Sequence, residues 1–349
     1  MMCNDIHTSP ASLLARYEQD QILVLLDDQV AWESPYPTLQ ITCSEAAKSL
    51  DTVTRIWDFM LEHAITRRGV LVCIGGGMLT DIGGFAAATY KRGIGYINIP
   101  TTLLAMIDAS SGGKTGFNYR GLKNRIGCFA PPVETLLCPA WLHTLPPQQM
   151  LSGFGEMLKT GLIESTDRYA DRVQNTDLLW NRLLQYDLDT MDIGALTPLI
   201  AQCVEAKERI VTADPHEAGL RKVLNFGHTF GHALEEIQMV NGKWENEKML
   251  HGYAVLYGMI AELYLSVVKL GCPKEPLQQL TRLMLQYYGR PDCKCSDRAQ
   301  LIELMQQDKK NEHANEINCT LLRDIGEPLI NQCITAEEAT EAWEYLFSL

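Results

Sequence analysis

Hydrophobic residues in the first half of the chain occur in short runs that end in turn residues. The runs are "QILVLLDD" (21–28), "GVLVCIGGG" (69–77) and "IGYINIP" (94–100), and an amphipathic helical pattern lies between the second and the third. Short β-rich runs separated by a helix are typical of βαβ units, whose strands form a parallel sheet. The pattern therefore predicts an N-terminal α/β domain.

Beyond residue 150 the apolar positions recur with the period of an α-helix. Helices are predicted in "SGFGEMLKTGLIE", "LTPLIAQCVEAKERIV", "NFGHTFGHALEEI", "HGYAVLYGMIAELYLSVVKL" and "PLQQLTRLMLQYYG". Later, "EINCTLLRDIG" predicts a returning strand or hairpin edge, and "TAEEATEAWEYLF" predicts a final helix. Because Pro146 and Pro147 close a loop ahead of a new helix, we expect an α/β domain at 1–147 and a mostly helical domain at 148–349.

Charge and cysteine usage narrow the class of protein. The 43 acidic and 30 basic residues give a net charge of −13, which argues against binding to nucleic acid or to an anionic membrane. The 11 cysteines lack the spacing of a secreted disulfide scaffold, and the CxC pair at Cys293 and Cys295 is a poor zinc site. No signal peptide or long apolar run is apparent. We expect a cytoplasmic protein with reduced thiols.

Glycines follow the second predicted strand. In "IGGGMLTDIGGFAAATY" the strand leads into Gly75-Gly76-Gly77, and a helix is predicted to start near Asp81. Strand, glycines and helix together can hold a pyrophosphate, although a plain tight turn fits the sequence equally well. The next segment gathers Thr101, Thr102, Asp108, Lys114, Lys123 and Asn124. Its glycines and apolar residues favour a loop that lines a ligand site over a solvated loop.

Two histidines stand four residues apart in "RKVLNFGHTFGHALEE" (221–236). His228 and His232 would share one face of a helix and could chelate zinc, or they could be two buried, hydrogen-bonded side chains. The motif segments also carry cations in an acidic protein: Arg92, Lys114, Lys123, Lys207, Arg221, Lys309 and Lys310. This grouping suggests a pocket for a phosphorylated or carboxylated small molecule.

Five motifs in fixed order resemble the 3-dehydroquinate synthase family. They are GGGxxxDxxGFAAATYxRG (75–93), PTTLLAxxDxSxGGKT (100–115), SGxxExxK (152–159), KxxxVxxDxxExGLRxxLNFGHTxGHA (207–233) and LHGxAVxxGM (250–259). The resemblance runs from about residue 43 to the C-terminus. It implies a nucleotide-binding α/β domain, a mostly helical domain, an active site between them, and the use of NAD and a divalent metal, zinc or cobalt.

The resemblance also implies roles for individual residues. Glu156, His228 and His251 would bind the metal, whereas His232 would face the substrate phosphate. Residues expected to contact NAD are Glu45, Lys48, Gly77, Met78, Leu79, Thr80, Asp81, Thr101, Thr102, Lys114, Lys123 and Thr144. Residues expected in catalysis and substrate binding are Asp108, Lys114, Asn124, Lys159, Lys207, Arg221, Asn225, His232, one of Lys309 and Lys310, and Arg92 across the interface of a homodimer.

Three departures from the family pattern stand out. The segment before "CSEAAKSL" is long enough only for a short loop, where the family usually has a crossover helix, so the adenosine side of the NAD site is expected to be weakened. Cys43-Ser44-Glu45 replaces the usual Asp-Gly-Glu. Tyr253 replaces the usual Glu after His-Gly, which could change how His251 is oriented.

The implied reaction converts 3-deoxy-D-arabino-heptulosonate 7-phosphate to 3-dehydroquinate by transient oxidation with NAD, loss of phosphate, re-reduction and aldol closure. Other sugar-phosphate cyclases, a metal-dependent polyol dehydrogenase of the glycerol dehydrogenase type, and an inactive scaffold protein are the alternatives. Cyclase substrates such as glucose 6-phosphate lack a carboxylate. The presence of Lys207, Arg221 and Asn225 therefore favours the carboxylated substrate.

Overall fold

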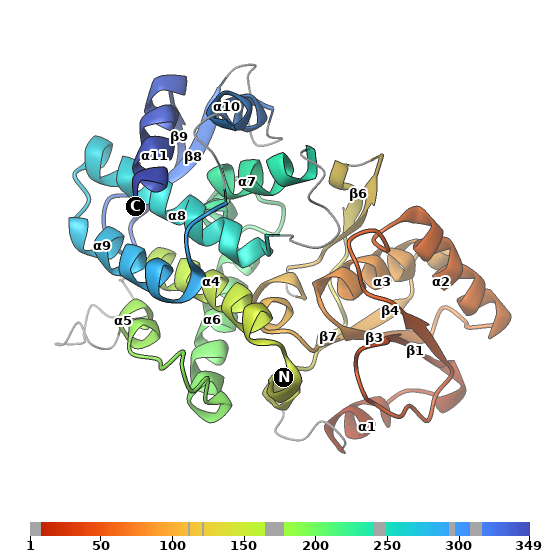
Figure 1. The fold of residues 1–349 in the computed structure, drawn as a ribbon. Helices are drawn as coiled ribbons and strands as arrows, with labels where there is room; N and C mark the ends of the chain where they lie inside the picture. The colour runs from red at the N-terminus through yellow and green to blue at the C-terminus, as the bar shows by residue number, and fades with distance from the viewer. Residues whose placement is uncertain are drawn as a thin grey trace. The chain divides into compact units, whose positions relative to one another are not determined.

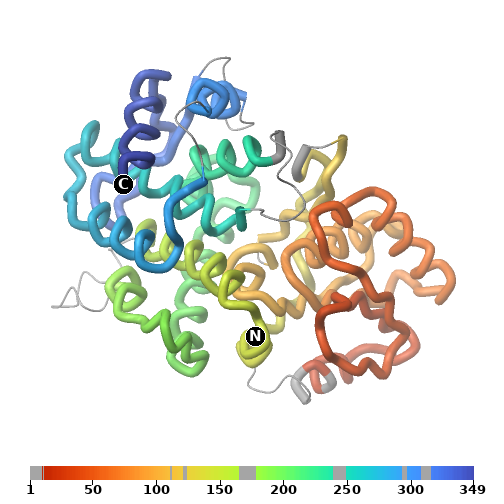
Figure 2. Tube along the Cα trace, in the orientation of Figure 1, coloured from red at the N-terminus to blue at the C-terminus, as the bar shows by residue number. Residues whose placement is uncertain are grey.

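The chain forms two compact units, Met1–Met150 and Leu151–Leu349, in the computed structural model. The structure describes residues 8–110, 112–120, 122–164, 178–240, 249–292, 297–307 and 316–349. Unit 1 contains a sheet with helices, and unit 2 is mainly helical (Figures 1 and 2). The expected fold class, a parallel-sheet domain followed by a helical domain, is confirmed.

A five-stranded parallel sheet is the centre of unit 1, with the strand order β2-β1-β3-β4-β7. The three predicted runs contain β1, β3 and β4, whereas β2 and β7 are short strands that the pattern does not reveal. The elements of the unit are α1 (Thr8–Leu14), β1 (Ile22–Asp27), β2 (Thr38–Ile41), α2 (Leu50–Glu62), β3 (Val70–Gly75), α3 (Gly77–Thr89), β4 (Gly95–Pro100), a π-helix (Ala105–Ala109), β5 (Lys114–Tyr119), β6 (Leu122–Phe129), β7 (Glu134–Thr135) and 3₁₀ turns at Gln19–Gln21, Tyr90–Arg92 and Pro139–Thr144.

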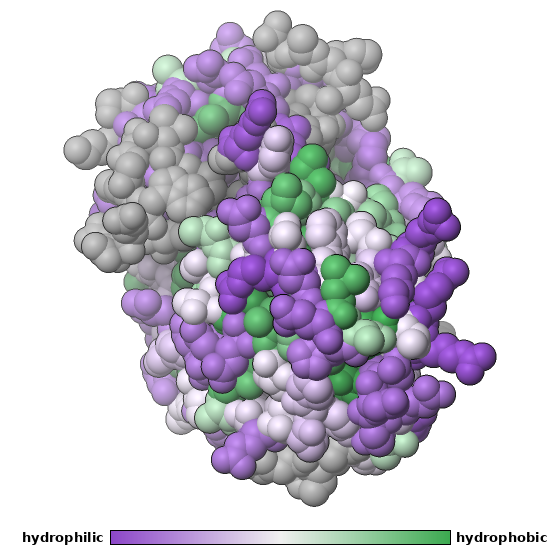
Figure 3. Space-filling model, turned by 90° about the vertical axis from the view of Figure 1, so that its right-hand side faces the viewer, coloured by the Kyte–Doolittle hydropathy of each residue, from purple (hydrophilic) through white to green (hydrophobic). Residues whose placement is uncertain are grey.

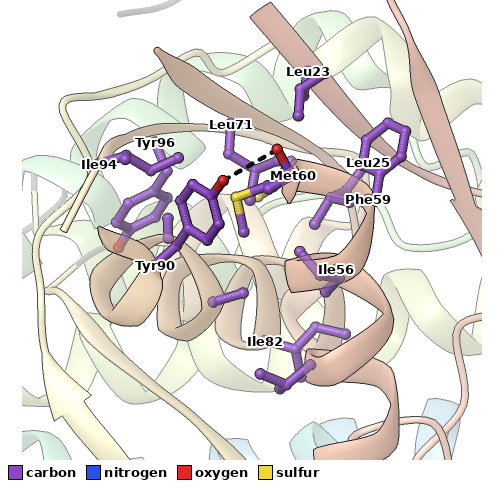
Figure 4. Packing of buried hydrophobic residues seen from close by; sticks show 14 of the residues in the cluster. Leu23, Leu25, Ile56, Phe59, Met60, Leu71, Ile82, Tyr90, Ile94 and Tyr96 are labelled. Atoms are coloured by element: carbon purple, nitrogen blue, oxygen red, sulfur yellow. Dashed lines mark hydrogen bonds between the residues drawn. The ribbon is translucent and has the colours of Figure 1, made fainter. Parts of the chain in front are cut away.

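Alternating residues of the central strands form the core against α2 and α3. Leu23 and Leu25 of β1 and Leu71 of β3 point to the face that these helices cover (Figure 4). Strand neighbours point to opposite faces, and the intervening residues of β1 and β3 are also buried. The Tyr90 hydroxyl donates to the Met60 carbonyl at 3.2 Å, so its polar end is satisfied inside this core.

Two local expectations in unit 1 are wrong. Helix α3 begins at Gly77 and not near Asp81, because Gly76 is extended and the helix continues directly from the strand. The segment after Thr102 is not simply a loop, since Ala105–Ala109 form a π-helix with three buried apolar side chains. The expected short connection is present: residues 28–37 join β1 to β2 with no helix between them.

Unit 2 is built around α8, whose middle is buried. Its elements are α4 (Pro147–Ile163), α5 (Leu179–Leu184), α6 (Ile193–Ala213), a 3₁₀ helix (Leu220–Asn225), α7 (His228–Val240), α8 (His251–Leu270), α9 (Lys274–Leu283), a π-helix (Met284–Tyr288), α10 (Arg298–Gln306), β8 (Ile317–Leu322), β9 (Pro328–Ile334) and α11 (Ala336–Ser348). Helix α8 has the length and composition of a membrane span, but 67% of that stretch is buried inside the protein, as in a core helix.

The C-terminal segment follows the sequence prediction. β8 and β9 pair as an antiparallel hairpin, and α11 follows it. The Thr335 side chain accepts from the Glu338 amide, and the Glu338 side chain accepts from the Thr335 amide. This capping box marks the start of α11.

Surface and thiols add two observations. The face of unit 1 turned to the viewer in Figure 3 carries many hydrophilic side chains with small apolar patches between them. Seven of the described cysteines have free thiols: Cys43, Cys73, Cys128, Cys203, Cys272, Cys319 and Cys333. Cys138 is disulfide-bonded, so the expectation of reduced thiols is wrong at that position.

Candidate functional site

Helix α4 supplies a buried carboxylate and a buried ammonium one turn apart. Glu156 is 1% exposed and Lys159 is 2% exposed. Residues i and i+3 lie on one face of a helix, and the Lys159 Nζ atom is 2.5 Å from Oε2 of Glu156. The lysine compensates the charge of one carboxylate oxygen.

His228 is the first residue of α7, and its ring has a defined orientation. Its Nδ1 atom lies 3.1 Å from the Phe226 carbonyl, which fits an N–H donor at that position. Its Nε2 atom lies 3.6 Å from Oε1 of Glu156. This tautomer leaves Nε2 as the nitrogen with a lone pair toward the carboxylate.

His251 is the first residue of α8 and faces two carboxylates. Nε2 lies 3.3 Å from Oε1 of Glu156, and Nδ1 lies 3.2 Å from Oε2 of Glu235. Burial lowers the pKa of His251, but Glu235 and Glu156 outweigh that effect and raise the pKa to about 10 in the metal-free protein. A metal ion that binds the His251 ring must therefore displace a proton from it.

Glu156, His228 and His251 together have the composition of a zinc site. One donor atom from each lies within 4.8 Å of the others, although the three residues come from three different helices. One carboxylate and two imidazoles leave coordination positions open, as in catalytic zinc sites. The residues therefore fit the expected metal.

His232 lies near this donor set without belonging to it. Its ring centroid is 5.3 Å from that of His228 and 6.4 Å from that of His251. The set of converging donors consists of the other three residues. The structure thus places His232 beside the candidate metal centre, where it could contact a bound ligand.

Glu235 was missed by the sequence reasoning. It lies on α7 seven residues after His228, two turns along the same face, so helical spacing could have revealed it. It gives His251 the carboxylate partner that metal-binding histidines usually have. Tyr253 instead packs edge-on against Tyr288, with a centroid distance of 4.8 Å. The missing family Glu at this position is thus matched by a carboxylate from α7.

Unit 2 also holds the expected cationic residues. Lys207 of α6 and Arg221 of the 3₁₀ helix are both buried. Arg221 donates from Nη1 to the Pro215 carbonyl at 2.7 Å, and its amide donates to Asp214. Asn225 donates to Glu217 at 2.9 Å. These contacts hold the segment that leads into His228.

The glycine turn lies where β3 meets α3, and neighbouring residues pack closely against it. A Cβ atom at Gly77 would lie 2.7 Å from the Ala109 Cβ, and one at Gly76 would lie 3.3 Å from Thr102. No side chain caps the start of α3, so backbone N–H groups and the positive end of the helix dipole face this turn. The geometry suits an anionic group such as a pyrophosphate.

Asp27 is a second residue that the sequence reasoning missed. It ends β1, and its Cβ would be 3.1 Å from a Cβ at Gly75. β2 and β3 lie on opposite sides of β1, so the strand order reverses there. Ligands bind at such switch points in open parallel sheets. The signal was present in "LLDD", an acidic pair directly after a buried strand.

Several expected NAD and substrate residues meet in one polar network of unit 1. The Lys48 ammonium donates to Asp81 at 2.6 Å and to Asn124 at 2.5 Å. Asn118, which was not singled out from the sequence, donates to Glu45 and accepts from the Asn124 amide. Met78, Leu79 and Thr80 lie in the first turn of α3 with Gly77. Thr101 is buried after β4, and its amide donates to Gly75.

The remaining expected residues are spread over other elements. Asp108 lies in the π-helix, Lys114 starts β5, and Thr144 donates to Trp141 within its own 3₁₀ helix. Arg92 is exposed and has a φ of 66°, a strained backbone for a residue other than glycine. The side chain of Lys123, and Lys309 and Lys310, lie outside the part of the chain that the structure describes.

Comparison with known proteins gives consistent matches. Residues 38–152 match the model for the 3-dehydroquinate synthase N-terminal region, and residues 153–311 match the model for its C-terminal region. A 3-dehydroquinate synthase of Parabacteroides distasonis is 39% identical over 356 residues, which cover 99% of this chain and 96% of that protein. The similarity to that relative therefore extends over nearly the whole length of both chains.

Two solved structures share the fold. A crystal structure of 2-deoxy-scyllo-inosose synthase with carbaglucose-6-phosphate, NAD⁺ and Co²⁺ has a TM-score of 0.82 at 24% identity and covers 97% of this chain and 94% of that one. A 2-epi-5-epi-valiolone synthase from Streptomyces hygroscopicus, with NAD⁺ and Zn²⁺ bound, has a TM-score of 0.78 at 26% identity and covers 100% and 96%.

Proposed function

The chain belongs to the 3-dehydroquinate synthase family, and we propose which of its residues carry out the reaction of that family. It converts 3-deoxy-D-arabino-heptulosonate 7-phosphate to 3-dehydroquinate and phosphate, a step of aromatic amino-acid biosynthesis, with NAD and a divalent metal as cofactors. The observation that carries the assignment is the convergence of Glu156, His228 and His251.

We propose that these three side chains bind the metal and that their neighbours keep them in place. Glu235 holds the His251 ring, and the Phe226 carbonyl holds the His228 ring. The metal, when bound, lowers the pKa of a coordinated substrate hydroxyl. Burial of Glu156 beside Lys159 keeps bulk water away from this part of the site.

NAD is proposed to bind unit 1 with its pyrophosphate at the glycine turn. The backbone of Gly77 to Asp81 would contact the phosphates, and Asp27 would accept from ribose hydroxyls. Further contacts are proposed for Glu45, Lys48, Thr101, Thr102, Lys114, Lys123 and Thr144. NAD supplies reversible hydride acceptance, and the protein's part is to bind and orient it.

The substrate is proposed to be held by cationic and amide side chains. Lys207 and Arg221 are suited to its carboxylate, because buried cations form strong, directional hydrogen bonds to carboxylates. His232 is assigned to the phosphate, since it lies one turn beyond His228. The remaining substrate contacts are proposed for Asp108, Lys114, Asn124, Lys159, Asn225 and Lys310.

We propose a cytoplasmic homodimer in which Arg92 contributes to the partner's site. A groove of about 420 Å³ on unit 1 includes Gly93, Phe129 and Val133 in its lining. Phe129 is 50% exposed and Val133 is 61% exposed, so the lining includes apolar surface that a second copy could cover. Sedimentation equilibrium should then give twice the chain mass, and Val133→Glu should shift the protein toward monomer.

One assay tests the function directly. Phosphate release from 3-deoxy-D-arabino-heptulosonate 7-phosphate should require both NAD and metal, and a chelator should abolish it. Catalytic NAD should support many turnovers, because oxidation and re-reduction cancel. Glucose 6-phosphate and sedoheptulose 7-phosphate are the controls for other cyclases. Turnover of either control in place of the carboxylated substrate, or stoichiometric NADH in the medium, would refute the assignment.

A further inference from the structure

Glu262 is a buried carboxylate in the middle of α8, outside the candidate metal site. It is 0% exposed. Its Oε2 accepts from the Gly227 amide at 2.7 Å, and its Oε1 accepts from the Thr229 amide at 3.3 Å. Both carboxylate oxygens are therefore bonded to the backbone on either side of His228.

The position of these two amides, at the N-terminus of α7, explains why the Glu262 carboxylate lies there. The Gly227 amide immediately precedes α7 and the Thr229 amide lies in its first turn, where backbone N–H groups have no partner within the helix. A side chain at the residue before the helix usually accepts from amides of the first turn, but Gly227 has no side chain. A negative group at this end of a helix is also favoured by the helix dipole. Glu262 thus caps α7 from another helix.

Close packing of α7 on α8 leaves no room for a local cap. Gly227 has a φ of 78°, and a Cβ there would lie 2.6 Å from the Met259 side chain. A Cβ at Gly258 would lie 1.9 Å from the Gly227 carbonyl oxygen. The backbones of the two helices are in direct contact at this point. A side chain at Gly227 is therefore sterically excluded, and the carboxylate of Glu262 on α8 takes the place of a local cap.

This arrangement links two metal ligands through one rigid element. Helix α8 begins with His251, and eleven residues later it carries the side chain that holds the backbone of His228. A similar link joins α4 to α8, since the Gly252 amide donates to Ser152 at 3.1 Å. Ligand distances in well-formed metal sites fall within about 0.2 Å of standard values. A small shift of the first turn of α7 would move His228 out of range.

We infer that Glu262 is a positioning residue for the metal centre: it fixes His228 relative to His251 by capping α7 from α8. The inference rests on the proposed metal site of Glu156, His228 and His251. It assigns Glu262 no contact with the metal, NAD or substrate. Its effect should therefore be on how tightly and in what geometry the metal is held.

The test compares Glu262→Gln with a control on the same helix. Gln keeps the size but replaces one acceptor by an NH₂ group that faces an N–H donor. Ser266→Ala is the matched control, because Ser266 is equally buried and its hydroxyl bonds the Leu322 amide and the Glu262 backbone carbonyl but not the Glu262 carboxylate. Zinc affinity is measured by competition with a chromophoric chelator. The visible spectrum of the cobalt-substituted protein reports the geometry of the metal site, and the Tm of the metal-free protein reports stability.

Glu262→Gln should weaken zinc binding about 10- to 100-fold and change the cobalt spectrum, as loss of an outer partner of a metal ligand does. Ser266→Ala should lower the Tm and leave both metal readouts unchanged. Zinc affinity within about twofold of wild type in Glu262→Gln, with the Tm lowered as in Ser266→Ala, would make Glu262 a structural cap only and overturn the inference.

Two further measurements keep the outcome interpretable. If Glu262→Gln does not fold, Glu262→Asp keeps the charge but withdraws it by one methylene, and it should lose zinc affinity in the same direction; unchanged affinity there would refute the inference. Glu156→Ala tests the underlying metal site. If wild type and Glu156→Ala bind zinc equally, the proposed site itself is wrong, whatever Glu262 does.

Discussion

Individual side chains around the candidate metal centre are oriented by hydrogen-bond partners outside it. The Phe226 carbonyl sets the tautomer of His228, and the Glu235 carboxylate holds the ring of His251. His232, on the same helix face as His228, does not join the converging donors. The two α7 histidines are therefore the same residue type on the same helix face, and only their surroundings distinguish the proposed metal ligand from its neighbour.

Substitution of the two α7 histidines should separate these tasks. We expect His228→Ala to lose the metal, because one of three protein ligands is removed. His232→Ala should keep the metal and show a raised KM for the phosphorylated substrate. Metal content by mass spectrometry, with steady-state kinetics, measures both. Full metal occupancy in His228→Ala would exclude it as a ligand, and metal loss in His232→Ala would restore the HxxxH chelate.

The role of Tyr253 can be tested by replacing it with Glu, the residue that the family usually has at this position. Because His251 already has Glu235 as a partner, Tyr253→Glu should not raise metal affinity. It should lower the free energy of unfolding by about 1 kcal/mol, since the edge-on contact with Tyr288 is lost. Tyr253→Phe keeps the ring and should be close to wild type in urea unfolding. A gain in zinc affinity for Tyr253→Glu would show that the missing Glu matters.

Whole elements differ in how far the sequence predicts them. The long helices α4, α6, α7 and α8 contain many buried apolar residues over three or more turns, so the sequence predicts them. The short edge strand β2 and the five-residue π-helix carry too few residues for any period to appear. The Gly77 start of α3 has no capping side chain to mark it.

The candidate site was predictable only where a motif names its residues. Glu156, His228 and His251 lie on three helices, and no local pattern joins them; the family motifs do. Asp27, Glu235 and Glu262 act through contacts between elements distant in sequence, and Asn118 through its network with Glu45 and Asn124. The acidic pair after β1 and the spacing of Glu235 from His228 are signals in the sequence, whereas the contacts of Glu262 and Asn118 depend on packing that a single sequence does not display.

The contact between α7 and α8 should be intolerant of added volume. Gly258→Ala would place a methyl group 1.9 Å from the Gly227 carbonyl oxygen, so the helices must separate. We expect a loss of about 1–3 kcal/mol in unfolding free energy together with weaker zinc binding. Val268→Ala is the control, because Val268 also lies on α8 and its side chain is exposed. Equal stability of the two variants in urea titrations would show that the contact is not tight.

At the scale of the whole molecule, the residues proposed to bind NAD and those proposed to bind the metal belong to different units. The proposed NAD residues lie in unit 1, and the metal ligands lie in unit 2. Unit 1 is shortened where β1 joins β2 without a helix, yet the Parabacteroides distasonis relative aligns with almost the whole chain. The cost of the short connection should fall on cofactor affinity before it falls on chemistry.

NAD should bind weakly to the free protein and more tightly when substrate is present. Loss of adenosine contacts that weakens NAD binding tenfold corresponds to about 1.4 kcal/mol, which a few missing contacts could account for. If substrate and NAD both favour the same conformation, each must raise the affinity of the other by the same factor. Calorimetric titration of NAD, with and without a non-reacting phosphonate analogue of the substrate, measures this factor. The reciprocal titration of the analogue, with and without NAD, is the internal control, because linkage requires the two ratios to agree. Equal NAD affinity in the free protein and in the analogue complex would show that the two ligands are not coupled. The short β1–β2 connection would then cause no loss of NAD affinity that substrate binding has to restore.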